Sequence, residues 1–333
     1  MKFGIIGYGK FGKLWEKCLM PFGQVFVYDK FDNSRNSKAR YKQVMNVDFL
    51  FLLVPISSLK ECCLQIRDDL KPETLVVDAC SVKIQPIAIL KRYLRKTQAV
   101  LPTHPLFGPD TYKCVGLKAQ KIVICPAINN FARNKFSNQQ NQLIDVFKKM
   151  GLKVIFSSAR EHDKMMAYSQ ALVHFVARGL KPLKLENFEI STRNYSLLYE
   201  LTKIVQNDTE QLFFDMERLN PFAKKLRNEF LTSIYDLEQK IAVPAEANLS
   251  YLRKEIEILD AQIIKNIALR FELVKRIGRL KNVQNLDIKD SSRELSLSKI
   301  HKAASQRMSI DPELILAIFD LIIAESRKIQ HKN

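Results

Sequence analysis

Long apolar runs and paired cysteines are both missing from this chain of 333 residues. No segment approaches the ~18 uninterrupted apolar residues that a membrane-spanning helix needs, so we expect no membrane partner. The six cysteines include no CxxC pair, which argues against a disulfide framework and against a bound metal ion. Residues 1–9 have the pattern of a strand that enters a turn rather than of a signal peptide. Together these absences favour a reduced, cytoplasmic protein.

Acidic residues are outnumbered: 35 Asp and Glu stand against 53 Lys and Arg, and the net charge is +18. A strong positive charge attracts polyanions, so nucleic-acid binding is one alternative function. The basic residues are spread along the chain, however, with no long basic run and no aromatic–basic repeat. We therefore expect no nucleic-acid partner. A basic surface also suits small polyanionic substrates.

The first half of the chain alternates short apolar segments with helical ones. Continuously apolar segments, such as residues 49–54, are typical of strands that are covered on both faces. The alternation predicts a doubly wound, Rossmann-like α/β domain over residues 1–158. Its strands are expected at residues 2–6, 24–28, 47–54, 74–78, 99–103, 121–125 and 153–156.

Only helical patterns follow residue 158. Residues 159–244 predict an all-α domain, and residues 241–250 have the composition of a linker. Residues 248–333 predict a second all-α domain of three helices. Its second helix is expected to begin at Asp290 and Ser291, with Ser291 and Glu294 spaced as a capping box. Pro312, in the first turn, marks the start of the third.

A glycine motif lies between the first expected strand and the first helix. Gly7, Gly9 and Gly12 form the pattern GxGxxG, which allows a tight turn and lets backbone N–H groups approach a pyrophosphate. Asp29, 17 residues after Gly12, ends the next strand. A carboxylate there accepts hydrogen bonds from the adenosine ribose and repels a 2′-phosphate, so we expect NAD as the cofactor. The nearby Lys30 and Arg35 leave NADP as an alternative.

Four further segments resemble the prephenate dehydrogenase family, and the resemblance extends over residues 3–240. They are Gly-Lys-Phe-Gly-Lys-Leu-Trp-Glu-Lys (9–17), Val-Asp-Ala-Cys-Ser-Val-Lys (77–83), His-Pro-Leu-Phe-Gly-Pro-Asp (104–110) and Glu-His-Asp-Lys-Met-Met-Ala (161–167). The motif His-Pro-x-Phe-Gly-Pro after a strand is quite specific to that family. The match is closest to the dehydrogenase half of fused mutase–dehydrogenases, which carry the mutase in front.

The resemblance assigns roles to several residues. His104 matches the catalytic His that accepts the proton of the substrate hydroxyl, as a neutral imidazole is suited to do. Ser81 matches the Ser that hydrogen-bonds this His and the hydroxyl, and Lys83 lies nearby as cationic support. His174 matches a position beside the substrate and tyrosine-inhibitor pocket, whereas His162 is left open between a core role and a functional one.

One position departs from the family pattern. The family usually has an Arg, five residues before an Asp, that binds a substrate carboxylate, and here the register gives Lys203. A Lys pairs with a carboxylate but lacks the bidentate fork of Arg. Weaker substrate binding, help from another cation such as Arg193, and a plain solvated surface Lys all stay open.

Residues 252–330 resemble the all-helical chorismate mutase domain almost from end to end. In that family the matching residues bind the carboxylates, the ether oxygen and the ring hydroxyl of chorismate. Lys281 and Gln330 match the donors to the ether oxygen, and Glu294 matches the residue on the ring hydroxyl. The other matching positions are Arg253, Arg270, Asp290, Arg293 and Ser326.

Helix geometry agrees with this assignment. Arg270 and Lys281 are 11 residues apart, which returns to within ~20° of one helix face, whereas Arg253 lies about 100° away from Arg270. We therefore expect Arg253 to serve the site of a second copy in a homodimer.

The sequence thus predicts a bifunctional enzyme of tyrosine biosynthesis. It would convert chorismate to prephenate, and then convert prephenate with NAD to 4-hydroxyphenylpyruvate. The resemblance also raises feedback inhibition by tyrosine. Two alternatives stay open: a prephenate dehydrogenase whose C-terminal domain is a non-catalytic, ligand-sensing regulator, and an NAD-dependent dehydrogenase of another hydroxy acid.

Overall fold

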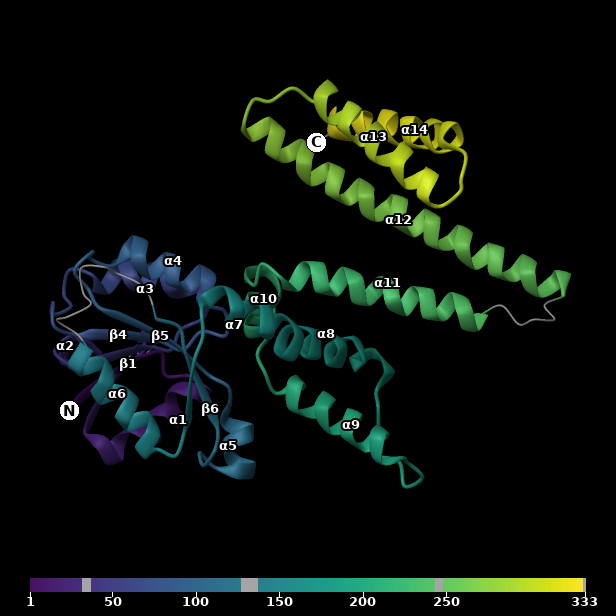
Figure 1. The fold of residues 1–333 in the computed structure, drawn as a ribbon. Helices are drawn as coiled ribbons and strands as arrows, with labels where there is room; N and C mark the ends of the chain where they lie inside the picture. The colour runs from purple at the N-terminus through teal and green to yellow at the C-terminus, as the bar shows by residue number, and fades with distance from the viewer. Residues whose placement is uncertain (32–36, 127–136, 243–247, 332–333) are drawn as a thin grey trace. The chain divides into compact units, whose positions relative to one another are not determined.

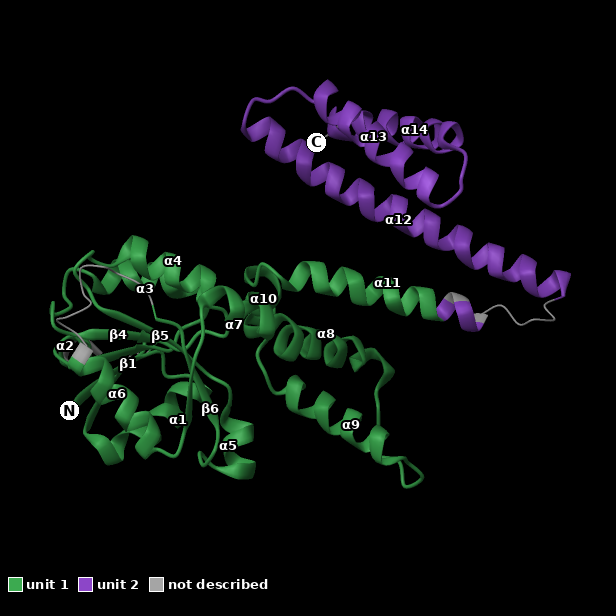
Figure 2. Ribbon diagram, in the orientation of Figure 1, with its two compact units in different colours: residues 1–237 green, residues 238–333 purple. Residues whose placement is uncertain are grey.

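The computed structural model describes residues 1–31, 37–126, 137–242 and 248–331. It divides into two compact units, residues 1–237 and residues 238–333, which Figure 2 shows in different colours. The first unit contains a sheet and the helices of both regions that the sequence assigns to a dehydrogenase. The second unit contains the three helices of the C-terminal region. No helix in the described part of the chain is long and apolar enough to cross a membrane.

A seven-stranded sheet forms the centre of the first unit, with strand order β2-β1-β3-β4-β5-β6-β7. The prediction of a Rossmann-like domain is confirmed, and every expected strand is present. One junction differs from a fully parallel sheet, because β5 and β6 are antiparallel. Only the short helix α5 (Pro109–Val115) lies between these two strands. The strands are β1 (Lys2–Ile6), β2 (Gln24–Tyr28), β3 (Phe49–Leu52), β4 (Leu75–Asp78), β5 (Val100–Pro105), β6 (Lys121–Ile124) and β7 (Lys153–Phe156).

Helices cover both faces of this sheet (Figure 1). Side chains along a strand alternate between faces, so Phe49 and Phe51 pack in one apolar cluster and Leu50 and Leu52 in the other. The first cluster includes Trp15 and residues of α1 and α6, and the second includes residues of α3 and α4. This double cover explains why β3 is apolar throughout. The helices are α1 (Lys10–Leu19), α2 (Ser37–Val44), α3 (Ile56–Ile66), α4 (Ile84–Tyr93) and α6 (Ser137–Lys149).

Helices alone follow β7 in the first unit, as expected. Ser158 caps α7 through a capping box with Glu161. A π-helical turn at Ala167–Ala171 joins α7 to α8, and such turns are frequent at functional sites. The helices are α7 (Ala159–Met166), α8 (Leu172–Gly179), α9 (Arg193–Gln206), α10 (Glu210–Leu219) and α11 (Ala223–Ala242).

The second unit packs α12 (Leu249–Val283), α13 (Ser291–Arg307) and α14 (Pro312–His331) together, which confirms the predicted three helices. The predicted capping box is wrong. Asp290, not Ser291, is the N-cap of α13, and its carboxylate accepts the backbone N–H of Arg293 at 2.9 Å. Glu294 is unavailable for a capping box because its carboxylate binds Arg327 on α14.

Candidate active sites

The glycine motif forms a turn between β1 and α1, and two of its three glycines leave no room for a side chain. Gly7 has a positive φ of 99°, and a Cβ there would collide with the carbonyl oxygen of Leu53. A Cβ on Gly12 would collide with the carbonyl oxygen of Gly7. A Cβ on Gly9 would meet nothing within 4 Å, and no side chain caps the N-terminus of α1 at this residue. The open helix N-terminus fits the pyrophosphate of a dinucleotide.

Asp29 lies directly after β2, beside the glycine turn. Its two carboxylate oxygens accept the backbone N–H of Tyr8 at 2.6 Å and of Phe31 at 2.9 Å. The carboxylate is therefore fixed next to the turn, as ribose binding requires. Lys30 pairs with Glu61 at 3.6 Å, and Arg35 lies outside the described residues.

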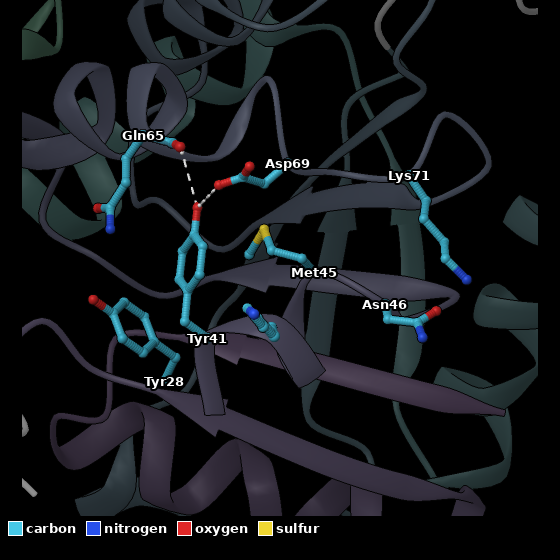
Figure 3. Close-up of a pocket in the computed structure, with 8 residues that line it drawn as sticks. Tyr28, Tyr41, Met45, Asn46, Gln65, Asp69 and Lys71 are labelled. Carbon is cyan, nitrogen blue, oxygen red and sulfur yellow. Dashed lines mark hydrogen bonds between the residues drawn. The ribbon is translucent and has the colours of Figure 1, made fainter. Parts of the chain in front are cut away.

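A pocket of about 590 Å³ opens beside α2, close to the same strand end (Figure 3). Tyr28, the residue before Asp29, lines it together with Tyr41, whose hydroxyl donates to Asp69 at 2.8 Å. No residue that the sequence assigns to a site lines this pocket.

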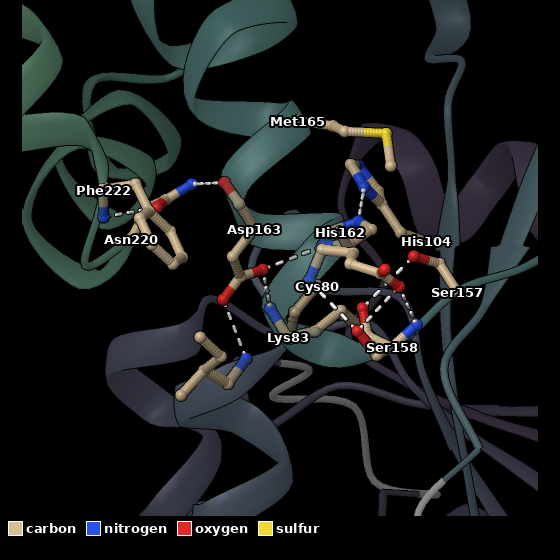
Figure 4. A network of polar contacts seen from close by, with 12 residues as sticks. Cys80, Lys83, His104, Ser157, Ser158, His162, Asp163, Met165, Asn220 and Phe222 are labelled. Carbon is tan, nitrogen blue, oxygen red and sulfur yellow. Dashed lines mark hydrogen bonds and ion pairs between the residues drawn. The ribbon is translucent and has the colours of Figure 1, made fainter.

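A buried pair of histidines lies where the sequence predicts the dehydrogenase chemistry (Figure 4). His104 lies near the carboxyl end of β5, and its Nδ1 lies 2.9 Å from Nε2 of His162 on α7. Nδ1 of His162 lies 2.8 Å from Oδ1 of Asp163. Burial lowers the pKa of His104 well below its ordinary value, with His162 and Lys83 adding to the effect. Burial also lowers the pKa of His162, which the hydrogen bond to Asp163 partly opposes. Both rings are therefore neutral near pH 7.

Lys83 lies close to this pair, and its side chain is buried rather than exposed to solvent. Its ammonium is fully buried, pairs with Asp78, and donates to the carbonyl of Thr103 at 2.5 Å. The backbone N–H of Lys83 donates to Asp163 at 2.7 Å. The buried charge is thus neutralised and hydrogen-bonded, as a buried charge must be. No hydrogen bond joins Ser81 to His104 among the described residues, so the role of Ser81 stays a prediction.

His174 lies on α8, within a second polar cluster. Its Nε2 is 3.7 Å from a carboxylate oxygen of Asp208, and its buried Nδ1 has no hydrogen-bond partner among the residues that the structure describes. Burial, with a smaller effect of Arg178, lowers the pKa of His174 to about 4. The ring is therefore neutral at pH 7, and its contact with Asp208 is not an ion pair. Burial raises the pKa of Asp208. The charge of Asp110, which follows His104 in the family motif, raises this pKa further.

Arg178 is the cation of this cluster, one helical turn after His174. Its guanidinium donates to the carbonyl of Asp208 at 2.8 Å and lies over the ring of Phe213 at 4.8 Å. Its buried Nε has no hydrogen-bond partner in the described part of the chain. The cluster adjoins the glycine turn, because the ammonium of Lys10 donates to the carbonyl of Asn207 at 3.1 Å. The dinucleotide turn, His174 and Arg178 therefore share one region.

Lys203 has a different setting. It is exposed on α9, and its ammonium lies 4.7 Å from the centre of the Tyr199 ring. Arg193, the first residue of that helix, is exposed as well.

The second unit carries the other predicted site residues, and some of them meet between its helices. Arg270 donates to the hydroxyl of Ser326 at 2.5 Å, and burial lowers its pKa. The ammonium of Lys281 donates to the carbonyls of Asp287 at 2.8 Å and Ile288 at 2.7 Å. The backbone and side chain of Gln330 pack against Gly278, and its buried Oε1 has no partner.

The two acidic residues that the sequence assigns to this site, Asp290 and Glu294, each accept hydrogen bonds from neighbouring groups. Asp290 accepts the backbone N–H of Arg293 and the hydroxyl of Ser292, which lower its pKa. Glu294 binds Arg327 in a two-pronged contact of 3.0 and 2.7 Å. Arg253 lies near the start of α12 and is exposed.

Two family models match separate parts of the chain. One, described as prephenate dehydrogenase, nucleotide-binding domain, matches residues 30–156. The other, described as chorismate mutase type II, matches residues 252–331. The chain thus carries, in one polypeptide, a domain that matches prephenate dehydrogenases and a domain that matches type II chorismate mutases. A third model, described as TYRAAT1-like, C-terminal domain, matches residues 179–250 between them.

Curated relatives agree with the dehydrogenase part. Arogenate dehydrogenase 1 of Arabidopsis thaliana is 28% identical over 252 residues, which cover 72% of this chain and 39% of the relative. The T-protein of Haemophilus influenzae is 31% identical over 188 residues, which cover 54% of this chain and 46% of the relative. In both comparisons the chain spans less than half of the relative's length.

A solved structure agrees with the fold. The prephenate dehydrogenase of Aquifex aeolicus, in complex with hydroxyphenyl propionate and NAD+, has a TM-score of 0.55 and 22% identity. The match covers 79% of this chain and 98% of that chain. At this identity the likeness extends to the fold alone.

The structure brings some of the residues that the sequence assigns to the two sites into direct contact, such as Arg270 with Ser326 and Asp290 with Arg293. Arg253 and Lys203 are instead exposed on their helices. In the dehydrogenase part the structure adds three residues that sequence analysis did not assign to a site: His162, its neighbour Asp163, and Arg178. The motif Glu-His-Asp (161–163) is the signal that could have identified the first pair. In the chorismate mutase domain it adds Arg327, next to Ser326 in the sequence but directed at Glu294. No pattern at the level of the sequence distinguishes Arg178 or Arg327 from other basic residues.

Proposed function

We propose that this chain catalyses two consecutive reactions. The mutase domain converts chorismate to prephenate, and the dehydrogenase domain converts prephenate and NAD+ to 4-hydroxyphenylpyruvate, CO₂ and NADH. The observation that carries the second reaction is a buried, neutral His104 at a strand end of a nucleotide-binding domain. The first reaction is supported by Arg270, Lys281 and Gln330, which match substrate-binding residues of the chorismate mutase family.

The dehydrogenase chemistry needs a base that is neutral and shielded from water. NAD, when bound, accepts a hydride from the ring carbon that carries the hydroxyl. His104 accepts the hydroxyl proton as the C–O bond becomes a carbonyl. The bond to the ring carboxylate then breaks, CO₂ leaves, and its electron pair makes the ring aromatic. His104 returns the proton to the oxygen, which becomes a phenol, so no net proton is released.

The fused mutase favours prephenate over arogenate, since prephenate is what a chorismate mutase makes. Curated relatives include arogenate dehydrogenases as well as T-proteins, so both substrates need testing. Initial rates of NADH formation from prephenate and from arogenate would test the proposal. We expect prephenate to have the higher kcat/KM, and a preference for arogenate would contradict it.

We expect NAD to be preferred over NADP. The fixed carboxylate of Asp29 would face the 2′-phosphate of NADP and repel it. Comparing kcat/KM for the two cofactors checks this, and Asp29→Asn should narrow the difference by improving NADP. A wild-type enzyme that prefers NADP would refute the role given to Asp29.

The prephenate dianion needs cations in the dehydrogenase site, and we infer that Arg178 and Lys203 both contribute. His174 cannot supply positive charge at pH 7, because its pKa is about 4. Arg178 is partly buried and held by backbone carbonyls, so its charge is well placed for a carboxylate. Lys203 is exposed, and exposed ion pairs contribute at most ~1 kcal/mol.

Arg178→Met is expected to raise KM for prephenate about 10- to 100-fold, the range for a charge-assisted hydrogen bond. Lys203→Ala should raise it by about fivefold or less, and Lys203→Arg should restore it. In each variant kcat should change little, because the lost contact is made in the bound substrate and the transition state alike. Lys225→Ala, at an exposed Lys that pairs with Glu229, is the control. A normal KM in Arg178→Met would place the carboxylate elsewhere.

The mutase reaction is a pericyclic rearrangement, so it needs no nucleophile. The site must hold a dianion in a compact conformation and stabilise negative charge on the breaking C–O oxygen. Arg270 can bind a carboxylate, and Lys281 and Gln330 can donate to the oxygen. Glu294 can accept from the ring hydroxyl through the lone pairs that Arg327 leaves free.

We propose that the protein is a homodimer through its mutase domain. Large apolar side chains on α12 are exposed in the single chain, among them Ile256 at 56% and Ile263 at 57%. Leu252 and Leu259 continue the same stripe at spacings of three and four residues and are exposed too. A second copy of α12 would cover this stripe and bring Arg253 to the partner's site.

A further inference from the structure

His104 can act as a base only at a ring nitrogen that carries no proton, and the structure determines which nitrogen that is. We propose that His162 is a positioning residue that holds the proton of His104 on Nδ1 and so leaves Nε2 as the base. The inference rests on the proposed dehydrogenase function. His162 itself does not contact the reacting atoms in this account; it acts through His104.

The argument begins at Asp163, whose partners are all donors. Its Oδ1 accepts the backbone N–H of Lys83 at 2.7 Å, and its Oδ2 accepts that of Ile84 at 2.9 Å. Its backbone carbonyl accepts the side-chain amide of Asn220 at 2.8 Å. The carboxylate is fully buried, so neither water nor rotation changes this arrangement. Asp163 therefore meets the His162 ring as an acceptor, and Nδ1 of His162 carries the proton.

The next step follows from the neutrality of the rings. A neutral imidazole has one N–H and one bare nitrogen. Because Nδ1 of His162 donates to Asp163, its Nε2 is bare and must accept. Its hydrogen-bond partner among the described residues is Nδ1 of His104 at 2.9 Å, which therefore donates. Nε2 of His104 is left bare, on the side of the ring away from His162 (Figure 4).

This placement of the protons requires both imidazole rings to be neutral. If His162 were protonated, its Nε2 would donate to His104, and the His104 proton would move to Nε2, where a base is needed. Two features oppose that state: the burial of both rings and the nearby buried ammonium of Lys83. Asp163 acts in the other direction, since its carboxylate favours a charged His162, but burial outweighs it.

A plainer reading is that His162 only fastens α7 to the sheet. The two readings differ in what a replacement must preserve. Packing requires volume at this position, whereas the proposed role requires an acceptor at the place of Nε2. Gln can put its Oε1 near that place, and Met fills a similar volume without a comparable acceptor.

We expect His162→Met to lower kcat for prephenate oxidation by about 10- to 100-fold, part of the 10² to 10⁴ that a general base contributes. KM for prephenate and for NAD should stay nearly unchanged. His162→Gln should recover most of the lost kcat. Equal losses in the two variants, or a loss confined to KM or to thermal stability, would reduce His162 to a structural role.

A spectroscopic measurement tests the inference without relying on a variant that folds. The chain has only five histidines, so long-range ¹H–¹⁵N spectra of the full-length protein labelled at His resolve each ring. In the wild type, His104 and His162 should both show the Nδ1–H tautomer at neutral pH. A His104 ring with its proton on Nε2 would overturn the proposal. If the protein failed to oxidise prephenate but showed these tautomers, the proposed function would fail and the relay would stand.

Discussion

His104→Asn should lower kcat of prephenate oxidation by about 10²-fold or more, because it removes the group that takes the hydroxyl proton in the transition state. Chorismate turnover should be unchanged, since the residues assigned to the mutase lie in the other unit of the chain. NADH formation at saturating substrate measures prephenate oxidation, and the disappearance of chorismate measures the mutase reaction. His331→Asn makes the same chemical change at an exposed position and should leave both activities intact.

The pH dependence gives a second readout of the same residue. Burial lowers the pKa of His104 well below the ordinary value of about 6.5. The base is therefore already neutral at pH 7, and activity is lost only as the pH falls through the lowered pKa. We expect kcat/KM of the wild type to stay level from neutral pH to below pH ~6.5 before it declines. NADH production by His104→Asn at the wild-type rate would remove His104 from the mechanism.

Mixing Arg253→Ala with Arg270→Ala is expected to restore mutase activity that neither variant has alone. Both residues lie on the single helix α12, so their geometry is simple. Seventeen residues separate them by about 25 Å along the helix and about 100° around it. One helix cannot bring both to the same substrate, but the α12 of a second copy can.

In a mixed dimer, one site would combine the intact Arg270 of one chain with the intact Arg253 of the other. The activity regained should approach one working site per mixed dimer, measured as chorismate consumed after subunit exchange. Lys254→Ala, a neighbour of Arg253 on the same helix, provides a matched variant that should remain active alone. If exchange is demonstrated and the mixture stays inactive, each site belongs to one chain and Arg253 has no role across the interface.

The sequence was sufficient for the sheet and for the C-terminal helices because these depend on local patterns. The strands β1 and β3 are apolar runs of the right length, and Gly7 and Gly12 are imposed by a turn that admits no Cβ. The positions of His104 and Arg270 followed from family motifs. The three C-terminal helices followed from periodicity and from Pro312.

What the sequence could not show depends on contacts between distant segments. His104 and His162 are 58 residues apart, and nothing in either motif indicates that the rings meet. The capping box at Ser291 failed for the same reason, because Glu294 finds a stronger partner in Arg327 on another helix. The antiparallel β6 depends on how a short connection returns to the sheet.

The most direct test of the whole account supplies the purified protein with chorismate and NAD, and with no other enzyme. The account predicts that 4-hydroxyphenylpyruvate and NADH form in equal amounts, after a lag in which prephenate accumulates. Omitting NAD should leave prephenate as the end product. A protein that consumes prephenate but leaves chorismate untouched would contradict the account, and would show that the C-terminal domain is a ligand-sensing module rather than a mutase.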